Sequence, residues 1–312
     1  MRALLVLFCS VLAALATPAS AEADKRIALT FDDAPTHPGA FLTEEERTAM
    51  LIDALDRAGV EQVAFFATTV NLETVPGGAE RLARLVAAGH VLANHTYSHP
   101  GLSGMTAEAF LADVDRAADW LHQQPGYRPW MRFPYLDEGG TDREKREAVR
   151  AGLAARGLSN GVVTAGGNDW QFDNLTVEAK AAGKTMDMAA LRELWIDTHV
   201  GSAEFNDELA RRTLGRSPAH VMLLHDRDVT ALFVADLVAA LKAKGWTIIT
   251  ADEAFADPLA AMLPDVPSAH GQVTEMVAWE RGIPEPRWYA GNDQAYVAAE
   301  FERRVLQTKD QE

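Results

Sequence analysis

Residues 26–35 read RIALTFDDAP, an almost unbroken apolar run that ends in two adjacent acids, Asp32 and Asp33. A run that is apolar on both sides is typical of a parallel strand covered by helices on both faces. In α/β folds, ligands bind where such strands end, at the carboxyl edge of the sheet. Two neighbouring carboxylates repel each other, so at the end of an apolar strand they need a cation or a proton. The alternative is a solvated turn or a helix cap, which aspartate also favours.

The rest of the chain repeats this pattern of short apolar strands followed by amphipathic helices. Further strands are predicted at 62–67, 91–94, 130–132, 161–165, 221–225 and 246–250. Capping boxes at 43–46 and 141–144, and Thr106 ahead of an apolar stripe, mark helix starts. About seven β-α units without internal repeats predict an α/β domain, either open or barrel-like.

Two stretches do not follow the alternation. Residues 171–216 separate two predicted strands by much more than one helix, and we expect a helical insertion there that forms a cap beside the site. Residues 256–312 are rich in proline before a final helix around 295–306, and we expect an extension packed on the domain. Neither stretch contains a linker strong enough to define a second independent domain.

The composition narrows the class of protein and of partner. The chain has 312 residues, of which 48% are hydrophobic and 24% charged, as in ordinary soluble globular proteins rather than disordered chains or coiled coils. Lys and Arg total 29 against 45 Asp and Glu, which gives a formal charge of -16. A surface of that sign repels nucleic acid and anionic lipid. A neutral or weakly charged ligand suits it better.

The N-terminus predicts export. A short positive region, an apolar run and the small residues Ala19 to Ala21 mark residues 1–21 as a secretory signal peptide, with an uncleaved anchor helix as the alternative. The mature protein is then periplasmic or extracellular, without stable membrane insertion. Cys9 is the only cysteine and leaves with the signal. Any metal site must therefore be built from histidine, aspartate and glutamate.

Histidines follow the strand predicted at 91–94. His95 and His99 stand at i and i+4 in the segment HTYSH, so their imidazoles face one point if the segment turns helically. With one carboxylate they form the three-ligand set that catalytic zinc uses, leaving a position for water. Histidines at this spacing also occur as caps or in packing. The pairing with Asp32 and Asp33 at another strand end favours a metal site.

Three further strand ends carry polar groups. Arg132 is suited to pair with a carboxylate and lower its pKa, and His225 has an ordinary pKa suited to proton donation. Asp169 offers a carboxylate to orient that imidazole, and Trp170 offers an aromatic wall for a sugar. A surface ion pair for Arg132, a cap for His225 and core packing for Trp170 are the alternatives.

Taken together, these segments resemble the five motifs of the polysaccharide deacetylases of carbohydrate esterase family 4. They are TFDD at 30–33, HTYSH at 95–99, RFPY at 132–135, DW at 169–170 and LLH at 223–225. The resemblance covers about residues 26–255. It implies a distorted (β/α) barrel of about seven units that carries the insertion and the extension. It also implies a divalent metal, usually zinc, and hydrolysis of N-acetyl or O-acetyl groups on a glycan.

Residue by residue, the resemblance assigns the metal site and the base. It makes Asp33, His95 and His99 the metal ligands and Asp32 the general base, with Arg132 tuning Asp32. The chain departs from the family at Ala34 and Phe133, where glycine and proline are common, and at Gly166, where an aspartate often stands.

The resemblance also assigns the acid and the pocket. His225 is implied to be the general acid, and Asp169 is the one obvious carboxylate left to orient it. The Tyr135 backbone N–H is implied to help hold the oxyanion, and Leu223 and Trp170 to shape the pocket for the acetyl methyl group.

The sequence therefore predicts an exported, metal-dependent deacetylase whose partner is an acetylated glycan. One alternative is a small-molecule amide or imide hydrolase on the same scaffold, and the other is a catalytically inactive glycan-binding protein. A long open groove favours a polymer and a roofed pocket favours a small substrate. The glycan, the choice between amide and ester, the metal (zinc, cobalt or another) and the oligomeric state stay open.

Overall fold

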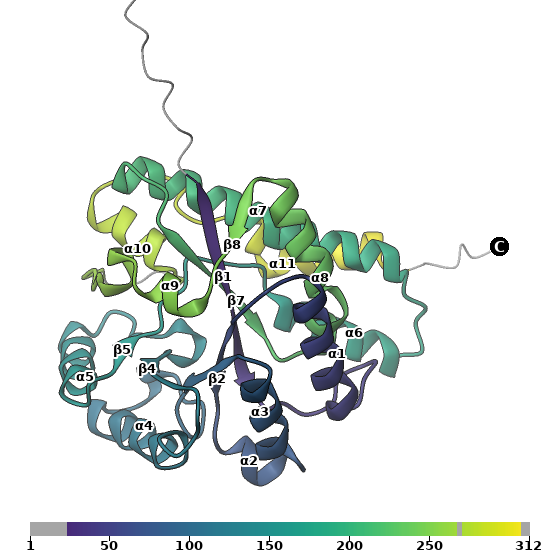
Figure 1. The fold of residues 1–312 in the computed structure, drawn as a ribbon. Coiled ribbons are helices and arrows are strands. Elements are labelled where there is room, and N and C mark those ends of the chain that lie inside the picture. Colours follow the sequence, from purple (N-terminus) through teal and green to yellow (C-terminus); the bar gives the residue numbers. More distant parts are fainter. Residues whose placement is uncertain (1–23, 267–269, 307–312) are drawn as a thin grey trace, which may run out of the picture.

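The computed structural model describes residues 24–266 and 270–306, and their strands form one parallel sheet (Figure 1). The strands are β1 (Lys25–Ala34), β2 (Ala64–Ala67), β3 (Val91–Asn94), β4 (Tyr127–Met131), β5 (Ser159–Asn160), β6 (Ala165–Gly166), β7 (Ala219–His225) and β8 (Trp246–Ile248). Their order across the sheet is β5-β4-β3-β2-β1-β7-β6, and β8 pairs with the first residues of β1. The predicted first strand thus lies in the interior of the sheet, where it pairs with β2, β7 and β8.

The two ends of the strand path, β5 and β6, are separated in sequence only by residues 161–164. Seven strands spaced about 4.8 Å apart would span roughly 29 Å in a flat sheet. The five peptide units from Asn160 to Ala165 reach about 18 Å at most. The sheet must therefore curl until its ends approach each other, which confirms the predicted distorted (β/α) barrel (Figure 1).

The strand predicted at 161–165 is wrong. This stretch crosses the opening between the two sheet ends instead of pairing in one strand. Gly161 lies so close to Phe66 that a Cβ would come within 2.5 Å of its ring. The N–H of Gly161 still donates to the Met131 carbonyl at 2.7 Å, but its own carbonyl accepts from the buried Arg132 Nε at 2.7 Å.

The opening is closed by a segment from far along the chain. Val163 forms a parallel bridge with Gln272, and the N–H of Val273 donates to the Val163 carbonyl at 2.8 Å. Val162, Val273 and Val277 share an apolar cluster there. The C-terminal part of the chain therefore packs into the break in the barrel.

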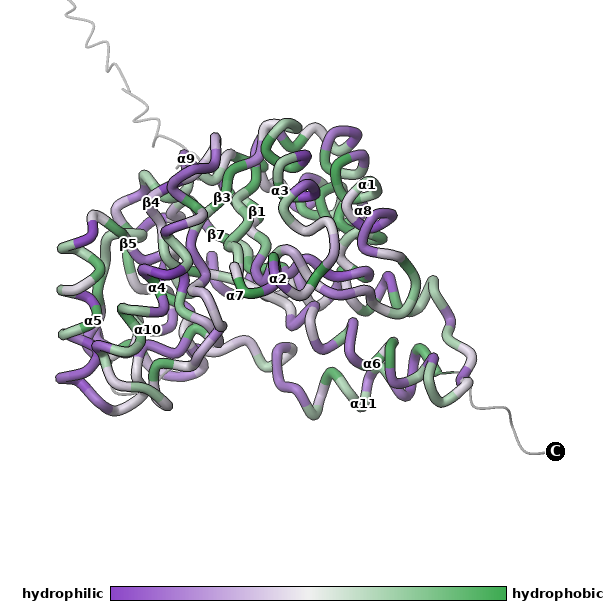
Figure 2. Tube along the Cα trace, turned by 90° about the horizontal axis from the view of Figure 1, so that it is seen from below, coloured by the Kyte–Doolittle hydropathy of each residue, from purple (hydrophilic) through white to green (hydrophobic). Residues whose placement is uncertain are grey.

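Helices surround the sheet, and Figure 2 shows apolar residues concentrated along the strands. They are α1 (Glu44–Arg57), α2 (Asn71–Thr74), α3 (Gly78–Ala87), α4 (Ala107–Leu121), α5 (Arg143–Ala155), α6 (Asp169–Ala181), α7 (Met188–Leu214), α8 (Asp228–Ala243), α9 (Ala251–Phe255), α10 (Val273–Glu280) and α11 (Gln294–Arg304). Thr43 caps α1 with the predicted capping box, and Thr106 caps α4. The box predicted at 141–144 is wrong: Asp142 caps α5, because its carboxylate accepts from the Lys145 N–H at 3.0 Å.

The region 171–216 consists of most of α6 and all of α7, and α7 lies against the barrel wall rather than over the sheet edge. It contacts α8, β6, α10 and α11. Trp195 on α7 is fully buried in the main apolar cluster. The helices α6 and α11 lie side by side (Figure 2).

No helix within residues 24–266 and 270–306 combines the length and apolar character that crossing a bilayer requires. The predicted signal peptide at 1–21 lies outside the described residues, and so does Cys9.

Candidate functional site

A cavity of about 540 Å³ opens at the carboxyl edge of the sheet. Nine of the ten residues singled out from the sequence line it, and the tenth, Arg132, is buried behind Asp32. The nine are Asp32, Asp33, His95, His99, Tyr135, Asp169, Trp170, Leu223 and His225. The structure thus brings together side chains that are far apart in sequence.

Asp32 and Asp33 both reach this cavity because β1 is irregular where they stand. Successive side chains of a regular strand point to opposite faces. The pairing of β1 with β2 shifts register between Asp32 and Ala34, and Asp33 has a left-handed backbone with φ of 70°. Such an irregularity redirects one side chain, as bulges beside active sites do. Two adjacent acids therefore share one site.

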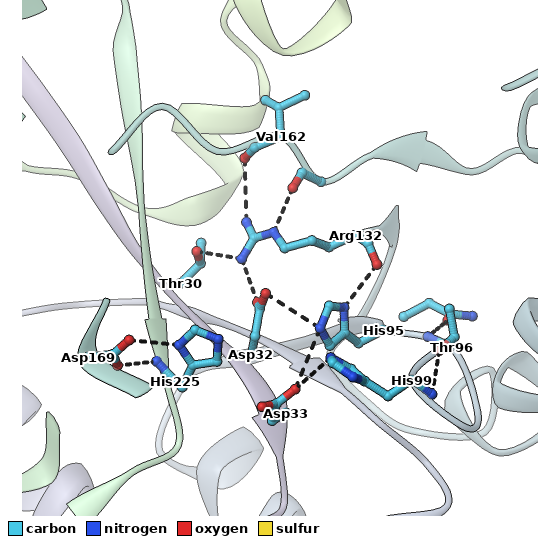
Figure 3. A network of polar contacts seen from close by, with 12 residues as sticks. Thr30, Asp32, Asp33, His95, Thr96, His99, Arg132, Val162, Asp169 and His225 are labelled. Carbon is cyan, nitrogen blue, oxygen red and sulfur yellow. Dashed lines mark hydrogen bonds and ion pairs between the residues drawn. The ribbon is translucent and has the colours of Figure 1, made fainter. Parts of the chain in front are cut away.

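Three side chains form a potential metal site (Figure 3). One ligand atom each from Asp33, His95 and His99 lies within 4.8 Å of the others. Asp33 Oδ1 is 3.1 Å from His99 Nε2 and 3.7 Å from His95 Nε2. One carboxylate oxygen and two imidazole nitrogens facing one point match the donor set of catalytic zinc sites.

The loop that carries the two histidines is not the helical turn that the sequence suggested. Thr96 and His99 have left-handed backbones, with φ of 68° and 58°. Asn94 Oδ1 accepts from the Thr96 N–H at 2.7 Å, and Thr96 Oγ1 accepts from the His99 N–H at 3.1 Å. These bonds hold a tight loop that turns both imidazoles toward Asp33.

Further contacts orient the three candidate ligands. His95 Nδ1 donates to the Arg132 carbonyl at 2.9 Å, which leaves Nε2 free of a proton and turned toward Asp33. Burial lowers the pKa of His95, which also favours the neutral, metal-binding form. Arg227 Nη2 donates to Asp33 Oδ2 at 3.0 Å, on the carboxylate oxygen that the histidines do not face. The sequence reading missed Arg227, although it stands two positions after His225 at the same strand end.

The ionisation of Asp33 is set by opposing effects. Burial raises the pKa of this carboxyl, but the hydrogen bond from His99 and the charges of His225 and His95 outweigh it. The pKa therefore lies well below its usual range, and Asp33 is an anion at any pH near neutrality. A cation placed between Asp33 and the imidazoles would find the negative charge it needs.

Asp32 is held by a buried arginine. Arg132 Nη1 donates to Asp32 Oδ1 at 2.6 Å and to Thr30 Oγ1 at 2.9 Å. The guanidinium is fully buried, its Nε donates to Gly161, and its plane lies over the Phe66 ring. Burial lowers the pKa of Arg132, and the charge of Asp32 opposes that shift. The other oxygen, Asp32 Oδ2, lies 3.6 Å from His95 Nε2, next to the candidate metal position.

His225 and Asp169 form a second buried pair. His225 donates to the Asp169 carboxylate through its backbone N–H at 2.6 Å and through Nδ1 at 2.7 Å, and Thr230 Oγ1 donates to it at 2.7 Å. Burial lowers the pKa of His225, but Asp169, Asp33 and Asp32 together outweigh it and raise the pKa to about 9. In the metal-free protein this imidazole is protonated at neutral pH. Asp169 thus contacts His225 even though Gly166 stands where the family often has an aspartate.

His225 also lies next to Asp32 in the sheet. The two residues are Cα partners across the β1–β7 pairing. A carboxylate and an imidazolium thus flank the cavity from neighbouring strands, with the Asp33, His95 and His99 cluster beside them (Figure 3). The arrangement supplies one group able to accept a proton and one able to donate it.

Tyr135 lies at the mouth of the cavity and is 73% exposed. Its backbone is left-handed, with φ of 57°, and its ring meets the His99 ring edge-on at 4.6 Å between centroids. Within the described residues, every non-glycine residue with a left-handed backbone lies at this edge of the sheet, at the end of β1 or in the segments that follow the strands: Asp33, Thr96, His99, Tyr135, Leu136 and Asn168. Each costs roughly 1–3 kcal/mol and persists where the surrounding contacts impose it, as at functional sites.

The sequence reading missed one whole side of the cavity. His270, Gln272, Trp288, Asn292 and Gln294, all from the C-terminal extension, line it together with the predicted residues. Of residues 171–216, by contrast, only Asn174 lines the cavity. The wall beside the site comes from the extension and not from the insertion.

Comparison with known proteins agrees with this geometry. Residues 19–155 match the family model described as polysaccharide deacetylase. A peptidoglycan-N-acetylglucosamine deacetylase of Bacillus cereus is 34% identical over 110 residues, which cover 35% of this chain and 36% of that protein. A chitin deacetylase of Colletotrichum lindemuthianum is 24% identical over 237 residues, which cover 74% of this chain and 79% of that protein.

Coverage differs among these relatives. A peptidoglycan-N-acetylglucosamine deacetylase of Listeria monocytogenes is 23% identical over 241 residues, but the match spans only 41% of that protein. The chain thus spans well under half of the two bacterial relatives. Among solved structures, the Colletotrichum lindemuthianum chitin deacetylase has a TM-score of 0.51 at 21% identity, covering 75% of this chain and 89% of that one. A Streptococcus mutans CE4 esterase also scores 0.51, at 22% identity, covering 73% and 87%. At such identities these structures show the shared fold.

Proposed function

We propose that this chain, whose residues 19–155 match the polysaccharide deacetylase model, is an exported, divalent-metal-dependent deacetylase of a glycan. The substrate carries N-acetyl or O-acetyl groups. The observation that carries the proposal is the convergence of Asp33, His95 and His99 within 4.8 Å, beside the Asp32–Arg132 and His225–Asp169 pairs.

The three candidate ligands fit a divalent cation. They offer one anionic oxygen and two imidazole nitrogens, and His95 is bonded so that Nε2 is the free nitrogen. Zinc is the usual choice for such donors, and cobalt or another transition metal is compatible with them. When bound, the cation supplies Lewis acidity, which lowers the pKa of a water molecule and polarises the acetyl carbonyl.

The protein's own groups then carry the proton transfers. Asp32, oriented by Arg132, takes the proton of the attacking water. His225, protonated through its pairing with Asp169, donates a proton to the leaving amine, or to the alcohol of an ester. The Tyr135 N–H helps to hold the oxyanion, a kind of donor typically worth about 3 kcal/mol. Trp170 and Leu223 shape the pocket for the acetyl methyl group.

The experiment that tests the proposal measures acetate release. The protein is offered N-acetylated chito-oligosaccharides and an O-acetylated xylan, with added zinc or with a chelator, and its metal content is determined by elemental analysis. We expect acetate release that the chelator abolishes and that zinc restores. A metal-loaded protein that releases no acetate from either class of substrate would contradict the proposed hydrolase.

A further inference from the structure

The C-terminal wall of the cavity, formed by His270, Gln272, Trp288, Asn292 and Gln294, has no counterpart in the motifs discussed so far. It lies beyond residues 26–255, where the sequence resemblance ends, and beyond residues 19–155, which match the family model. It nevertheless lines the same cavity as the candidate metal ligands, the Asp32 carboxylate and the His225 imidazole. A substrate bound at those groups therefore meets this wall.

Hydrogen bonds fix the C-terminal wall to the first turn of α6, which carries Asp169 and Trp170, and to the residues just before it. Asn292 Nδ2 donates to the Gly166 carbonyl at 2.7 Å, and Asn168 Nδ2 donates back to the Asn292 carbonyl at 2.7 Å. Gln171 Nε2 donates to the Gln294 carbonyl at 2.7 Å. On the other side, Gln272 pairs with Val163 across the break in the barrel. The wall is thus held at both of its ends.

An aromatic pair lies within this wall. The rings of Trp288 and His270 stack with centroids 3.9 Å apart and planes 16° apart. The buried Glu275 carboxylate fixes His270, because it accepts from the ring Nδ1 at 2.8 Å and from the backbone N–H at 2.9 Å. A half-buried indole is thereby kept in place at the cavity, with its apolar surface available to a ligand.

The chemistry of the wall suits a neutral sugar. Amide side chains both donate and accept hydrogen bonds, so Gln272 and Gln294 suit a ligand that carries hydroxyl groups. An indole ring suits a ligand with an apolar face. The five wall residues include neither lysine nor arginine, so they offer no permanent cation to a phosphate or a uronate. A pyranose ring has the required apolar face and hydroxylated rim.

We propose that the C-terminal wall is a binding subsite for a neutral pyranose ring, with the stacked Trp288–His270 pair as its platform. The cavity, about 540 Å³, has the size of sites that enclose a small ligand. The whole cavity therefore takes a short stretch of glycan, of which one ring lies on the Trp288–His270 platform. This inference rests on the proposed deacetylase function, since it names a part of the protein that recognises the same substrate.

The test compares two tryptophans on the extension. Trp288→Ala removes the platform, and Trp288→Phe keeps an aromatic ring. Trp279→Ala is the matched control, because Trp279 is 37% exposed on α10 and does not line the cavity. Binding of N-acetylated chito-oligosaccharides is measured by calorimetry with a chelator present, so that no turnover occurs. Melting temperatures show that each variant is folded.

We expect Trp288→Ala to raise Kd about tenfold, Trp288→Phe to raise it less than about threefold, and Trp279→Ala to leave it unchanged. In the zinc-loaded enzyme, the KM of Trp288→Ala for acetate release should rise by the same factor while kcat stays within about twofold. A folded Trp288→Ala that binds the oligosaccharides as the unaltered protein does would overturn the subsite. Loss of kcat with unchanged KM and Kd would overturn it as well.

The two proposals fail separately. If the zinc-loaded protein releases no acetate but binds oligosaccharides in a Trp288-dependent manner, the hydrolase is wrong and the subsite stands. If acetate is released and Trp288→Ala changes neither Kd nor KM, the subsite is wrong and the hydrolase stands.

Discussion

The buried pair of Asp169 and His225 gives the sharpest prediction. Asp169→Asn keeps the size of the side chain but removes the negative charge that raises the pKa of His225 to about 9. With that charge gone, burial pushes the pKa down, and an opposite charge at this distance typically accounts for 1–3 units. At pH 7.5 a group of pKa 9 is about 97% protonated, and one at the ordinary 6.5 is about 9% protonated. If the pKa falls to the ordinary 6.5, the fraction of His225 that carries its proton at pH 7.5 falls about tenfold.

The sign of the effect follows from the proposed role of His225 as general acid. A general acid must carry its proton, so the rate falls as pH rises through its pKa. A bound cation opposes the charges of Asp33 and Asp32, so the descending limb of kcat in the metal-loaded enzyme is expected between pH 6.5 and 9. In Asp169→Asn that limb should move to lower pH by about one unit or more. Since the imidazole also loses its orientation, kcat at pH 7.5 should fall about 100-fold.

The assay is the initial rate of acetate release from chito-oligosaccharides between pH 5.5 and 9.5 with saturating zinc. The chain supplies a matched control, because Asp207 pairs with the buried His220 at 3.3 Å outside the cavity. Asp207→Asn removes the same charge from a similar pair and should leave the limb where it is. An Asp169→Asn enzyme with an unshifted limb and a kcat within about twofold of the original would refute the argument.

Other predictions concern the metal, the base, the buried arginine and a buried histidine. His95→Ala and His99→Ala should each lose both bound zinc and acetate release. Asp32→Asn should keep its zinc, measured by elemental analysis, but its kcat should fall at least about 100-fold. Full activity in Asp32→Asn would remove Asp32 from the mechanism. Arg132→Leu leaves the Asp32 charge buried without its partner and should lower the free energy of unfolding of the metal-free protein by about 3–5 kcal/mol in urea titrations; an unchanged midpoint would show that Asp32 finds another partner. Burial lowers the pKa of His90 to about 4, so the unfolded chain binds its proton more tightly and stability is lost as pH falls from 6.5 toward 4. In chelator-treated samples, His90→Leu should lose less stability as the pH falls from 6.5 toward 4. Identical profiles of stability against pH for the variant and the unaltered protein would contradict this explanation.

The sequence located the site through a general rule for parallel sheets. Polar residues that follow apolar strands meet at one edge, and this placed Asp32, His95 and His225 together without any knowledge of their contacts. The sequence could not predict distances or local backbone geometry. The irregularity at Asp33, which lets two adjacent acids face one cavity, depends on the pairing with β2 and leaves no mark in the sequence around it.

What the sequence reading missed depends on contacts between distant segments. The strand predicted at 161–165 has suitable apolar residues, but the barrel opens there, and Val163 pairs with Gln272 instead. The C-terminal wall was missed for the same reason: nothing near Trp288 in sequence shows that it reaches the cavity. The expected cap at 171–216 was derived from segment length alone, and α7 instead contributes Trp195 to the core.

The interior position of β1 in the sheet also determines when the cavity can assemble during synthesis. Thr30 on β1 donates to the carbonyl of Met222 on β7, 192 positions later. A ribosome must therefore translate more than two-thirds of the chain before the first-made strand meets this neighbour and His225 reaches Asp32. Contacts this distant form slowly, because the entropy of closing the loop is lost before the contact repays it. The nascent polypeptide thus lacks the assembled cavity for most of translation.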